Sequence, residues 1–354
     1  MLSRSLLLLL ILCGPLLMRA QYTITGRIVD STTQEPLYRA SVFCQGTTLG
    51  TSSDKDGYFQ LPLRSGGYDL TISYTGYLPQ VVRVSESIDL PIALVKRDNS
   101  LGEVVIKSSN EVADGWDKYG DFFKNHFIGE SKLATTCEIR NPETLRFLYY
   151  KKSNRLKVLA DEPLQLIHPG LGYEIRYQLD SFVYYYNTEY FLYRGYSFYT
   201  ELEGEDSTRL AWKRNRSDAY AGSRLQFMHN YYDSTLEENG WVIDLLNENS
   251  EKTFTKINPY DTTFYLMLDS TEEIEIDFPR KISITYKKKS PEPGYLKSMK
   301  LPKGTPYLIS YIDLKFPIVI RPNGYFYNQS DWFQQGYWVW KNVGDQLPTD
   351  YEPD

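Results

Sequence analysis

The stretch Ser52-Ser53-Asp54-Lys55-Asp56-Gly57-Tyr58-Phe59-Gln60-Leu61-Pro62-Leu63 decides between two folds, because it can form a calcium loop or a turn before a strand. An EF-hand loop needs an aspartate at its first position and a glutamate at its twelfth. With Gly57 at position six, those positions hold Ser52 and Leu63, so oxygen ligands are missing. The residues after Gly57 alternate between apolar and polar, as in a strand. The stretch therefore predicts a hairpin turn, with Gly57 at positive φ and the aspartates bonding local backbone amides.

The chain around this turn, from Gln21 to about Lys96, consists of short strand patterns separated by turn signals, with no helical period. Seven short strands at this spacing are typical of a β-sandwich. We therefore predict a seven-stranded β-sandwich over residues 21–96. Its predicted strands are 23–29, 40–45, 48–52, 58–63, 68–74, 81–84 and 90–95.

The motifs of this region follow one another in the order of a known family. They are Gly26-x-Ile28-x-Asp30, Glu35-Pro36-Leu37, Gly50-Thr51-x-x-Asp54, Gly57-x-Phe59-x-Leu61 and Tyr68-x-Leu70-x-Ile72-Ser73-Tyr74-x-Gly76-Tyr77. The region resembles the carboxypeptidase-regulatory-like domain, and the resemblance implies a transthyretin-like sandwich that serves as an accessory module. Such domains often precede the plug of TonB-dependent outer-membrane receptors, and residues 100–106 are similar to the segment that leads into such plugs. The roughly 250 residues that follow are too few for a plug and a 22-stranded barrel.

The first twenty residues have the layout of a secretory signal peptide, with Arg4, an apolar run over residues 6–12 and Ala20 at the cleavage position. The apolar run is too short to span a bilayer. We predict export to the envelope of a Gram-negative bacterium, in the periplasm or associated with the outer membrane, the cell surface included. Residues 10–13 also resemble a lipobox, so acylation of Cys13 stays as an alternative, although Leu12 is larger than the small residue expected there.

Charge and cysteine content narrow the classes of partner. Of 39 lysines and arginines, Arg4 and Arg19 lie in the predicted signal peptide, so the mature chain has 37 against 45 acidic residues, a net charge of −8. An acidic chain without a basic cluster argues against nucleic acid and anionic lipid surfaces as partners. Cys44 and Cys137 remain after cleavage, and we predict two buried thiols, with a disulfide as the alternative.

After a linker over residues 97–113, residues 114–354 predict an α+β domain of mostly antiparallel sheet with two helices, so the whole chain is mainly β. The first predicted helix begins after Asp114 and ends at Gly129. The second runs over about 217–239, before Gly240. Residues 125–142, 161–177 and 220–223 are similar to the C-terminal part of uncharacterised exported proteins that carry the same module, and that resemblance implies no activity.

The sequence contains no recognisable catalytic or metal-binding motif. His126, His168 and His229 do not occur in His-Glu-x-x-His or His-x-x-Glu, and zinc needs three or four ligands. Neither a Gly-x-Ser-x-Gly elbow nor a phosphate-binding glycine motif is present. We therefore expect structural histidines, and we assign no catalytic residue, metal or cofactor.

One tyrosine-rich segment is a candidate binding surface. Amphipathic aromatic rings can stack on sugar faces or anchor a partner strand. The alternative is that these are sheet tyrosines that alternate between core and solvent. The candidate residues are Tyr184, Tyr186, Tyr190, Tyr193, Arg194 and Tyr196.

These observations favour an exported, non-enzymatic binding or assembly protein, with an envelope protein or a glycan as its partner. A partner strand could add to an edge of the sandwich. One alternative is a hydrolase of unrecognised type that acts on glycan or peptide through the second domain. Another is an accessory component of a TonB-dependent uptake system. The mature chain contains no predicted membrane-spanning segment, and its ligand and oligomeric state stay open.

Overall fold

The structure, a computed structural model, describes residues 21–64, 66–97, 110–250, 252–268, 273–326 and 331–353. The described residues fall into two compact units, one within Met1–Val42 and Gly50–Arg97 and the other within Phe43–Leu49 and Asp98–Asp354. The predicted signal peptide, the alternative acylation site Cys13 and residues 98–109 of the predicted linker lie outside the described residues.

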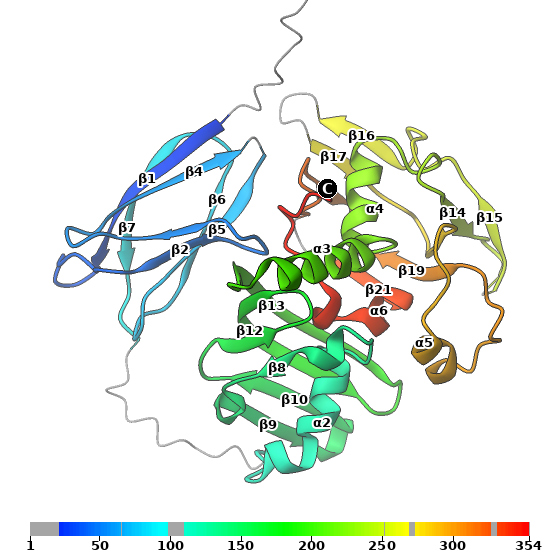
Figure 1. The fold of residues 1–354 in the computed structure, drawn as a ribbon, viewed down its shortest axis with the longest axis horizontal. Helices are drawn as coiled ribbons and strands as arrows, with labels where there is room; N and C mark the ends of the chain where they lie inside the picture. The colour runs from blue at the N-terminus through cyan, green and yellow to red at the C-terminus, as the bar shows by residue number, and fades with distance from the viewer. Residues whose placement is uncertain are drawn as a thin grey trace, which may run out of the picture. The chain divides into compact units, whose positions relative to one another are not determined.

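The first unit is a sandwich of two sheets (Figure 1). One sheet has the strand order β4-β1-β7 and the other has the order β3-β2-β5-β6. The strands are β1 Gln21–Asp30, β2 Ser41–Cys44, β3 Gly50–Ser52, β4 Tyr58–Arg64, β5 Tyr68–Ser73, β6 Gln80–Val84 and β7 Ile88–Leu94. Each overlaps the strand predicted at its place in the sequence, so the predicted seven-stranded sandwich is confirmed.

Alternation along the strands supplies the core of this sandwich. In β4 the apolar residues Phe59, Leu61 and Leu63 are buried, while the residues between them are exposed. Ile24 and Ile28 of β1 have no exposed surface. Burying a side chain of this size stabilises the fold by about 1.5–3 kcal/mol. The period-two pattern of the sequence is therefore sufficient to place both faces of these strands.

The stretch at residues 54–58 is a turn, as predicted, but it does not join a hairpin. Asp54 Oδ1 accepts the backbone N–H of Asp56 and of Tyr58, each at 2.9 Å, and Gly57 has a φ of 83°. β3 and β4, on either side of the turn, belong to different sheets. The turn type is correct and the hairpin is wrong, because the local hydrogen bonds fix the turn while the pairing of the strands is set by the rest of the sandwich.

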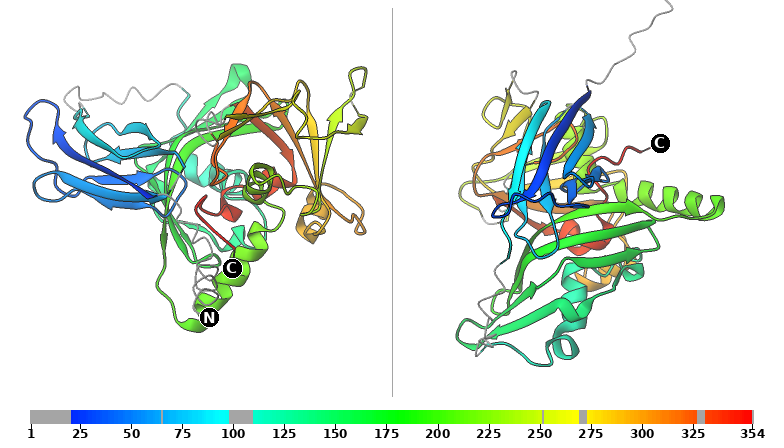
Figure 2. Two further views of the ribbon diagram at one scale, coloured as in Figure 1. Left: turned by 90° about the horizontal axis from the view of Figure 1, so that it is seen from above. Right: turned by 90° about the vertical axis from the view of Figure 1, so that its left-hand side faces the viewer.

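The second unit begins with a six-stranded antiparallel sheet. The strand order is β8-β11-β12-β10-β9, with β13 paired to the other edge of β12. Residues 110–112 extend it, since the N–H of Val112 donates to Phe147 O at 2.9 Å. Figure 2 shows the long strands β12 and β13 curving side by side. The strands are β8 Glu138–Ile139, β9 Leu145–Tyr150, β10 Arg155–Ala160, β11 Leu164–His168, β12 Tyr173–Tyr185 and β13 Tyr190–Glu201.

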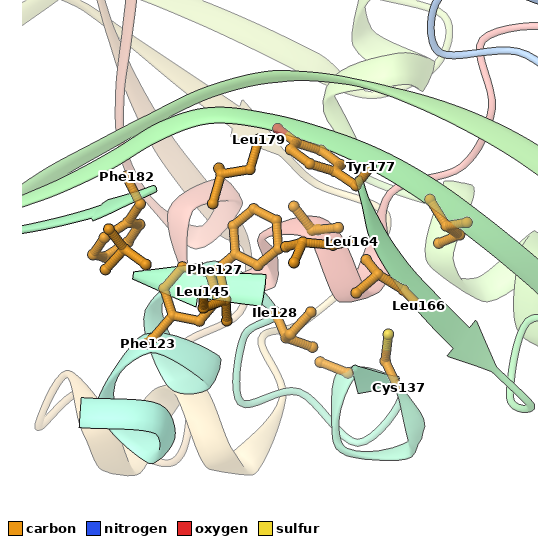
Figure 3. Packing of buried hydrophobic residues seen from close by; sticks show 14 of the residues in the cluster. Phe123, Phe127, Ile128, Cys137, Leu145, Leu164, Leu166, Tyr177, Leu179 and Phe182 are labelled. Atoms are coloured by element: carbon orange, nitrogen blue, oxygen red, sulfur yellow. The ribbon is translucent and has the colours of Figure 1, made fainter. Parts of the chain in front are cut away.

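Helix α2, Gly115–Phe127, covers one face of this sheet and ends at Gly129, as predicted. Phe123 and Phe127 have no exposed surface and stack on each other at 4.9 Å between ring centroids. Figure 3 shows both rings pointing towards Phe182 and Leu179 of β12. The aromatic stripe of the helix is thus the centre of the first core of this unit.

The second predicted helix is two helices, α3 Asp206–Tyr220 and α4 Arg224–Tyr232. The helix is interrupted at Gly222, whose φ of 82° is not helical. Ser223 then caps α4, with its hydroxyl accepting the N–H of Gln226 at 3.1 Å. The prediction of one helix over about 217–239 was wrong. It followed an apolar stripe that runs on through this region and gave too little weight to Gly222 and the Ser223 cap.

Two further antiparallel sheets complete the unit, with the orders β15-β14-β18-β19-β21 and β16-β17-β20. Their strands are β14 Trp241–Leu246, β15 Phe254–Lys256, β16 Tyr265–Leu268, β17 Glu273–Ile276, β18 Ile282–Tyr286, β19 Leu308–Leu314, β20 Ile318–Ile320 and β21 Trp332–Gly336. The remaining helices are α5 Pro293–Ser298 and α6 Tyr337–Lys341, with 3-10 turns at Ala134–Thr136, Pro142–Thr144, Lys151–Ser153 and Val343–Asp345.

The fold class predicted from the sequence, mainly β with an antiparallel α+β second domain, is confirmed. The described residues contain five helices, α2 to α6, where two were predicted. Cys44 and Cys137 are buried and free, so the predicted thiols are present rather than a disulfide. Among the residues that the structure describes, no helix is both long and apolar enough to cross a membrane.

Candidate binding site on the β12–β13 sheet

The antiparallel pairing of β12 with β13 decides which of the predicted binding residues share a face. Paired residues point to the same face, and successive residues of a strand alternate between faces. Tyr193 pairs with the buried Phe182, so it lies on the inner face that packs against the helices. Arg194 follows it and lies on the outer face. The inner face takes Tyr184, Tyr186 and Tyr193, and the outer face takes Tyr190, Arg194 and Tyr196. The six residues are therefore not one surface.

Two of the inner tyrosines belong to the core. Tyr184 is 7% exposed, and its ring lies edge-on to Phe122 at 4.7 Å. Tyr186 stacks on the same phenylalanine at 5.7 Å and is half-buried. Their rings are already occupied by neighbours, which favours the interpretation as core tyrosines at these two positions.

The outer face has an aromatic row that crosses four strands. Arg155 of β10 pairs with Tyr150 of β9 on one side and with Tyr185 of β12 on the other. Tyr185 in turn pairs with Tyr190 of β13. All four side chains are half-buried. We call this row, Tyr150, Arg155, Tyr185 and Tyr190, the outer row.

The outer row has the chemistry of a stacking surface. The Arg155 guanidinium lies over the Tyr150 ring at 4.5 Å from its centroid. Its Nε is buried and has no hydrogen bond with any residue that the structure describes. Cross-strand aromatic pairs stabilise a sheet by a few tenths of a kcal/mol up to about 1 kcal/mol. Of the residues predicted for binding, only Tyr190 belongs to this row, and Tyr150, Tyr185 and Arg155 were missed because their register is a tertiary property.

On the inner face, a second set of residues surrounds Arg224, the first residue of α4. The Ser223 cap and the Gln226 side chain, whose Oε1 accepts the N–H of Gly222 at 2.7 Å, fix the start of this helix. The next residue, Leu225, packs against the same core as Tyr177 and Tyr199. The cap therefore sets Arg224 at the first position of α4, one residue before Leu225.

The charge of Arg224 acts on three tyrosines of β12 and β13, Tyr177, Tyr193 and Tyr199. Burial raises the pKa of each of the three hydroxyls, and the charge of Arg224 acts in the opposite direction on every one. Tyr193 OH also accepts a hydrogen bond from Gln346 Nε2 at 3.2 Å. We call Arg224, Tyr177, Tyr193, Tyr199 and Gln346 the Arg224 site.

Two polar groups of the Arg224 site lack partners. The guanidinium of Arg224 has no hydrogen bond or ion pair with any described residue, and its contact is with the ring of Phe326, 5.5 Å from the ring centroid. Burial lowers the pKa of Arg224. The hydroxyl of Tyr177 likewise has no hydrogen bond within the described part of the chain. In Figure 3 this hydroxyl points away from Phe123 and Phe127.

Arg216, on the preceding helix, has the opposite surroundings. Its Nε donates to Leu171 O at 2.8 Å, its Nη2 to Gly172 O at 3.2 Å and its Nη1 to Glu201 Oε1 at 2.6 Å. The guanidinium also lies 3.9 Å over the ring of Tyr173. Arg216 is therefore a fully bonded side chain that fastens α3 to the β11–β12 turn.

A buried ionic network joins α6 to the loop after α2. Lys341 Nζ lies 2.6 Å from Glu292 Oε1 and 2.6 Å from Asp345 Oδ1. The Ser131 hydroxyl donates to Asp345 Oδ2. Burial raises the pKa of Asp345, and burial opposes but does not outweigh the two carboxylates that raise the pKa of Lys341. Both carboxylates are engaged by one ammonium group, an arrangement that stabilises the fold.

Each histidine makes a local hydrogen bond. His126 Nδ1 donates to Phe122 O at 2.8 Å, and His229 Nδ1 lies 2.8 Å from Tyr220 OH. His168 accepts the N–H of Leu171 at Nδ1, so Nε2 carries the proton that is donated to Gly344 O at 2.7 Å. Burial lowers the pKa of His168 and of His229.

The start of α2 borders a cavity of about 300 Å³. Acidic residues line it, and its cation Arg146 is held by both Glu111 oxygens at 3.0 Å. Within the described ranges no three histidine, cysteine or acidic side chains are grouped to hold a metal ion. Because Arg146 is already paired with Glu111, this arginine is not free to bind an anionic ligand in the cavity.

Comparison with known proteins identifies the first unit. Residues 24–106 match the family model described as the CarboxypepD_reg-like domain. This region belongs to that family. The match begins within β1 and includes β2 to β7, and the resemblance stated from the sequence motifs is confirmed.

Part of the chain also resembles curated proteins. The chain is 39% identical over 93 residues to the TonB-dependent receptor SusC of Bacteroides thetaiotaomicron, a segment that covers 26% of this chain and 9% of the receptor. It is 25% identical over 105 residues to the TonB-dependent receptor P3 of Formosa agariphila, covering 30% of this chain and 10% of that receptor. The chain thus spans about a tenth of the length of these relatives.

Among solved structures, the chain is similar to a chain in a type II cohesin–X-dockerin complex from Acetivibrio cellulolyticus. The identity is 27%, the match covers 21% of this chain and 58% of that chain, and the TM-score is 0.18.

Sequence reasoning found Tyr193 and missed its neighbours in the Arg224 site. Alternation along residues 174–180 places Tyr177 on the buried face, so part of the signal was present. The Ser223-x-x-Gln226 pattern is a helix-start signal that would have placed Arg224 at the first position of α4. No local pattern brings Gln346 to Tyr193, because 153 residues separate them.

Proposed function

We propose that the chain is an exported, non-enzymatic binding or assembly protein of the bacterial envelope. The observation that carries this proposal is the CarboxypepD_reg-like domain at residues 24–106, together with the similarity of that segment to TonB-dependent receptors. The second unit supplies the ligand-binding surface, and the outer row and the Arg224 site are its two candidates.

The geometry favours binding over hydrolysis. Hydrolysis of a glycosidic bond requires two carboxyl groups that stay free to act on the substrate. The carboxylates that converge in this unit, Glu292 and Asp345, are both paired with Lys341. The hydrolase alternative therefore has no support from this pair. The third alternative, an accessory component of an uptake system, depends on acylation of Cys13, which lies outside the described residues.

Chemical cross-linking in the native cell envelope tests the proposal. An amine-reactive cross-linker followed by mass spectrometry should join the mature chain reproducibly to one envelope partner. The described part of the CarboxypepD_reg-like domain contains two lysines, Lys55 and Lys96, and both are exposed. If the partner binds this domain, the double variant Lys55→Arg/Lys96→Arg keeps the charge and should lose the cross-link.

The matched control is Lys297→Arg/Lys300→Arg, which changes two exposed lysines of the second unit. It should keep a cross-link that the first pair makes. Random abundant neighbours in place of one reproducible partner would contradict the assembly role.

A further inference from the structure

Strand β16 is a sheet edge made only of apolar residues. Its sequence is Tyr265-Leu266-Met267-Leu268, and it lies at one end of the order β16-β17-β20 (Figure 1). Leu266 and Met267 are each 54% exposed. An exposed apolar edge is a template for pairing with another chain, and proteins usually block such edges with a proline, a charged residue or a bulge. β16 has no proline and no charged residue, and its pairing with β17 is regular.

The main chain of β16 offers hydrogen-bonding groups to a further strand. The N–H of Asp277 donates to Phe264 O at 3.0 Å, so these two opposite residues are a hydrogen-bonded pair. Bonded and non-bonded pairs alternate along an antiparallel ladder. Leu266 therefore bonds to β17, while the N–H and C=O of Met267 point away from β17. No strand among the described residues pairs with β16 on that side.

The buried face of this sheet ends at the side chain of Met267. Opposite residues of neighbouring strands share a face, so Met267, Ile274 and Ile320 form one row across β16, β17 and β20. Ile274 is 1% exposed and Ile320 has no exposed surface, whereas Met267 is 54% exposed. A further strand with an apolar side chain beside Met267 would extend this core and remove apolar surface from water, which is favourable.

Other sheet edges within the described ranges have the features that block pairing. β4 contains Pro62 and β7 contains Pro91, and a proline cannot donate to a ladder. β15, at the edge of another sheet of the second unit, has three residues and ends at the exposed Lys256. β16 differs from these edges because its outward N–H is kept and its exposed side chains are apolar.

The charges around β16 select the kind of partner. Residues 261–277 contain six acidic residues and no basic one. Asp261 and Asp277 are exposed, and Glu275, which pairs with Leu266, has no ion pair with a described residue. A second copy of this chain would bring like charges together. A strand with basic flanks would meet charges of the opposite sign, which favours its association.

We propose that the β16 edge binds a partner protein by strand addition, taking an extended segment with an apolar centre and lysine or arginine at its flanks. This inference rests on the proposed assembly role and adds the kind of segment that binds. Met267 exchanges main-chain hydrogen bonds with the added strand, and its side chain packs against an apolar residue of that strand. The acidic residues around β16 attract the basic flanks and oppose pairing between two copies of this chain.

Fluorescence anisotropy of a labelled peptide with the purified mature chain tests the proposal. The probe is Lys-Lys-Val-Thr-Val-Thr-Val-Lys-Lys with blocked termini. One matched peptide has glutamate in place of every lysine, and another has proline in place of the central valine. The probe should bind at least about 10-fold more tightly than either match, because the first reverses the charge and the second cannot pair along its length.

Variants of Met267 separate strand addition from non-specific attraction. Met267→Pro removes the outward N–H without removing a bond to β17, and it should weaken binding of the probe by about 10-fold or more. Met267→Lys should also weaken it, because a charge on an edge opposes pairing. The matched control is Met299→Lys, at a methionine that is 51% exposed and lies outside β16, and it should leave binding unchanged. Glu275→Gln should weaken binding about 3-fold, since one complementary charge is lost.

Hydrogen exchange with mass spectrometry locates the added strand. The probe should slow exchange in fragments that cover β16, because the N–H of Met267 becomes hydrogen-bonded. Exchange in β15, Phe254–Lys256, should stay unchanged. This measurement uses the wild-type chain, so it tests the edge even if Met267→Pro fails to fold.

The outcomes that refute this edge differ from those that refute the assembly role. Equal binding of the probe and a matched peptide, full binding by a folded Met267→Pro, or unchanged exchange in β16 would each refute strand addition there. A dimer in sedimentation equilibrium that Met267→Lys dissociates would assign the edge to a second copy and overturn the proposal. None of these results bears on the cross-linked partner, whereas probe binding without a reproducible partner would support the edge and contradict the assembly role.

Discussion

Helices α3 and α4 each carry an arginine, Arg216 and Arg224, and the two guanidinium groups differ in their hydrogen-bond partners. Arg216 donates to two carbonyls and a carboxylate, and it lies over a tyrosine ring. Arg224 lies 5.5 Å from the centroid of the Phe326 ring and has no hydrogen bond or ion pair with the described residues. The comparison teaches that burial of a charged residue near aromatic rings does not reveal its role. The partners of its polar atoms do, since a satisfied group stabilises the fold and an unsatisfied one is available to a ligand.

Lys341 extends the comparison to a third buried cation, with two carboxylate partners. Lys341→Met should lower the free energy of unfolding by about 4 kcal/mol, because Asp345 is left as a buried charge without its cation. Urea unfolding followed by tryptophan fluorescence measures the change. The control Lys297→Met replaces an exposed lysine and should change the free energy by less than about 0.5 kcal/mol. Equal effects of the two substitutions would show that the network does not stabilise the unit.

Arg216→Met should have the next largest effect, a loss of about 3 kcal/mol in the free energy of unfolding. The carbonyls of Leu171 and Gly172 lose their donor, and an unsatisfied buried acceptor costs about 1–3 kcal/mol. The Glu201 ion pair contributes little to this loss because Glu201 is 61% exposed. Arg214→Met, two residues earlier in α3 and exposed to solvent, is the control in the same urea titration. If Arg216→Met lowers the free energy of unfolding no more than Arg214→Met does, the hydrogen bonds of Arg216 do not stabilise the fold.

The carboxylate of Asp30 in the CarboxypepD_reg-like domain accepts several hydrogen bonds, and we therefore predict that the stability of this domain depends on pH. The Tyr77 hydroxyl, at 2.6 Å, and the N–H groups of Thr33 and Thr32 lower the pKa of Asp30 to about 2, from 3.8. Because the pKa is lowered on folding, the stability it contributes is present above pH 3.8 and is lost as the pH falls towards 2.

Hydrogen exchange of the backbone amides of β1, compared at pH 5 and at pH 2.5 after correction for intrinsic rates, measures this contribution. Protection in the wild-type chain should fall between the two values, and Asp30→Asn should remove most of the difference. Asp56→Asn, at an exposed aspartate of the 54–58 turn, should behave as the wild type. An undiminished difference in Asp30→Asn would assign the acid sensitivity to other carboxylates.

The first unit could be predicted almost completely because its strands are short, alternating and separated by turn residues. Phe59, Leu61 and Leu63 illustrate this, since period two alone buries all three. The second unit was predicted in class but not in detail. The apolar residues that follow Ser223 continue the stripe of the preceding helix, so the pattern did not reveal that Gly222 separates α3 from α4.

The candidate site was predictable only in part, for a geometric reason. Tyr190 and Tyr193 are three residues apart and lie on opposite faces of the sheet, a division that follows from strand alternation once β13 is known. The grouping of Tyr150 and Arg155 with Tyr185 depends on the register of three strands, which the sequence pattern leaves open. Arg224 was missed because a charged residue at a helix start is ordinary until its lack of partners is seen.

The contrast between the two arginines is tested most directly by the ligand-free free energy of unfolding of Arg224→Met, measured by urea titration beside Arg216→Met. Replacing a half-buried charge that has no partner among the described residues with an apolar side chain of similar length should leave the stability unchanged or raise it. We predict a value equal to or above that of the wild type for Arg224→Met and a clear loss for Arg216→Met. A loss of similar size in both would show that Arg224 is a structural residue, and it would contradict the assignment of this site to a ligand.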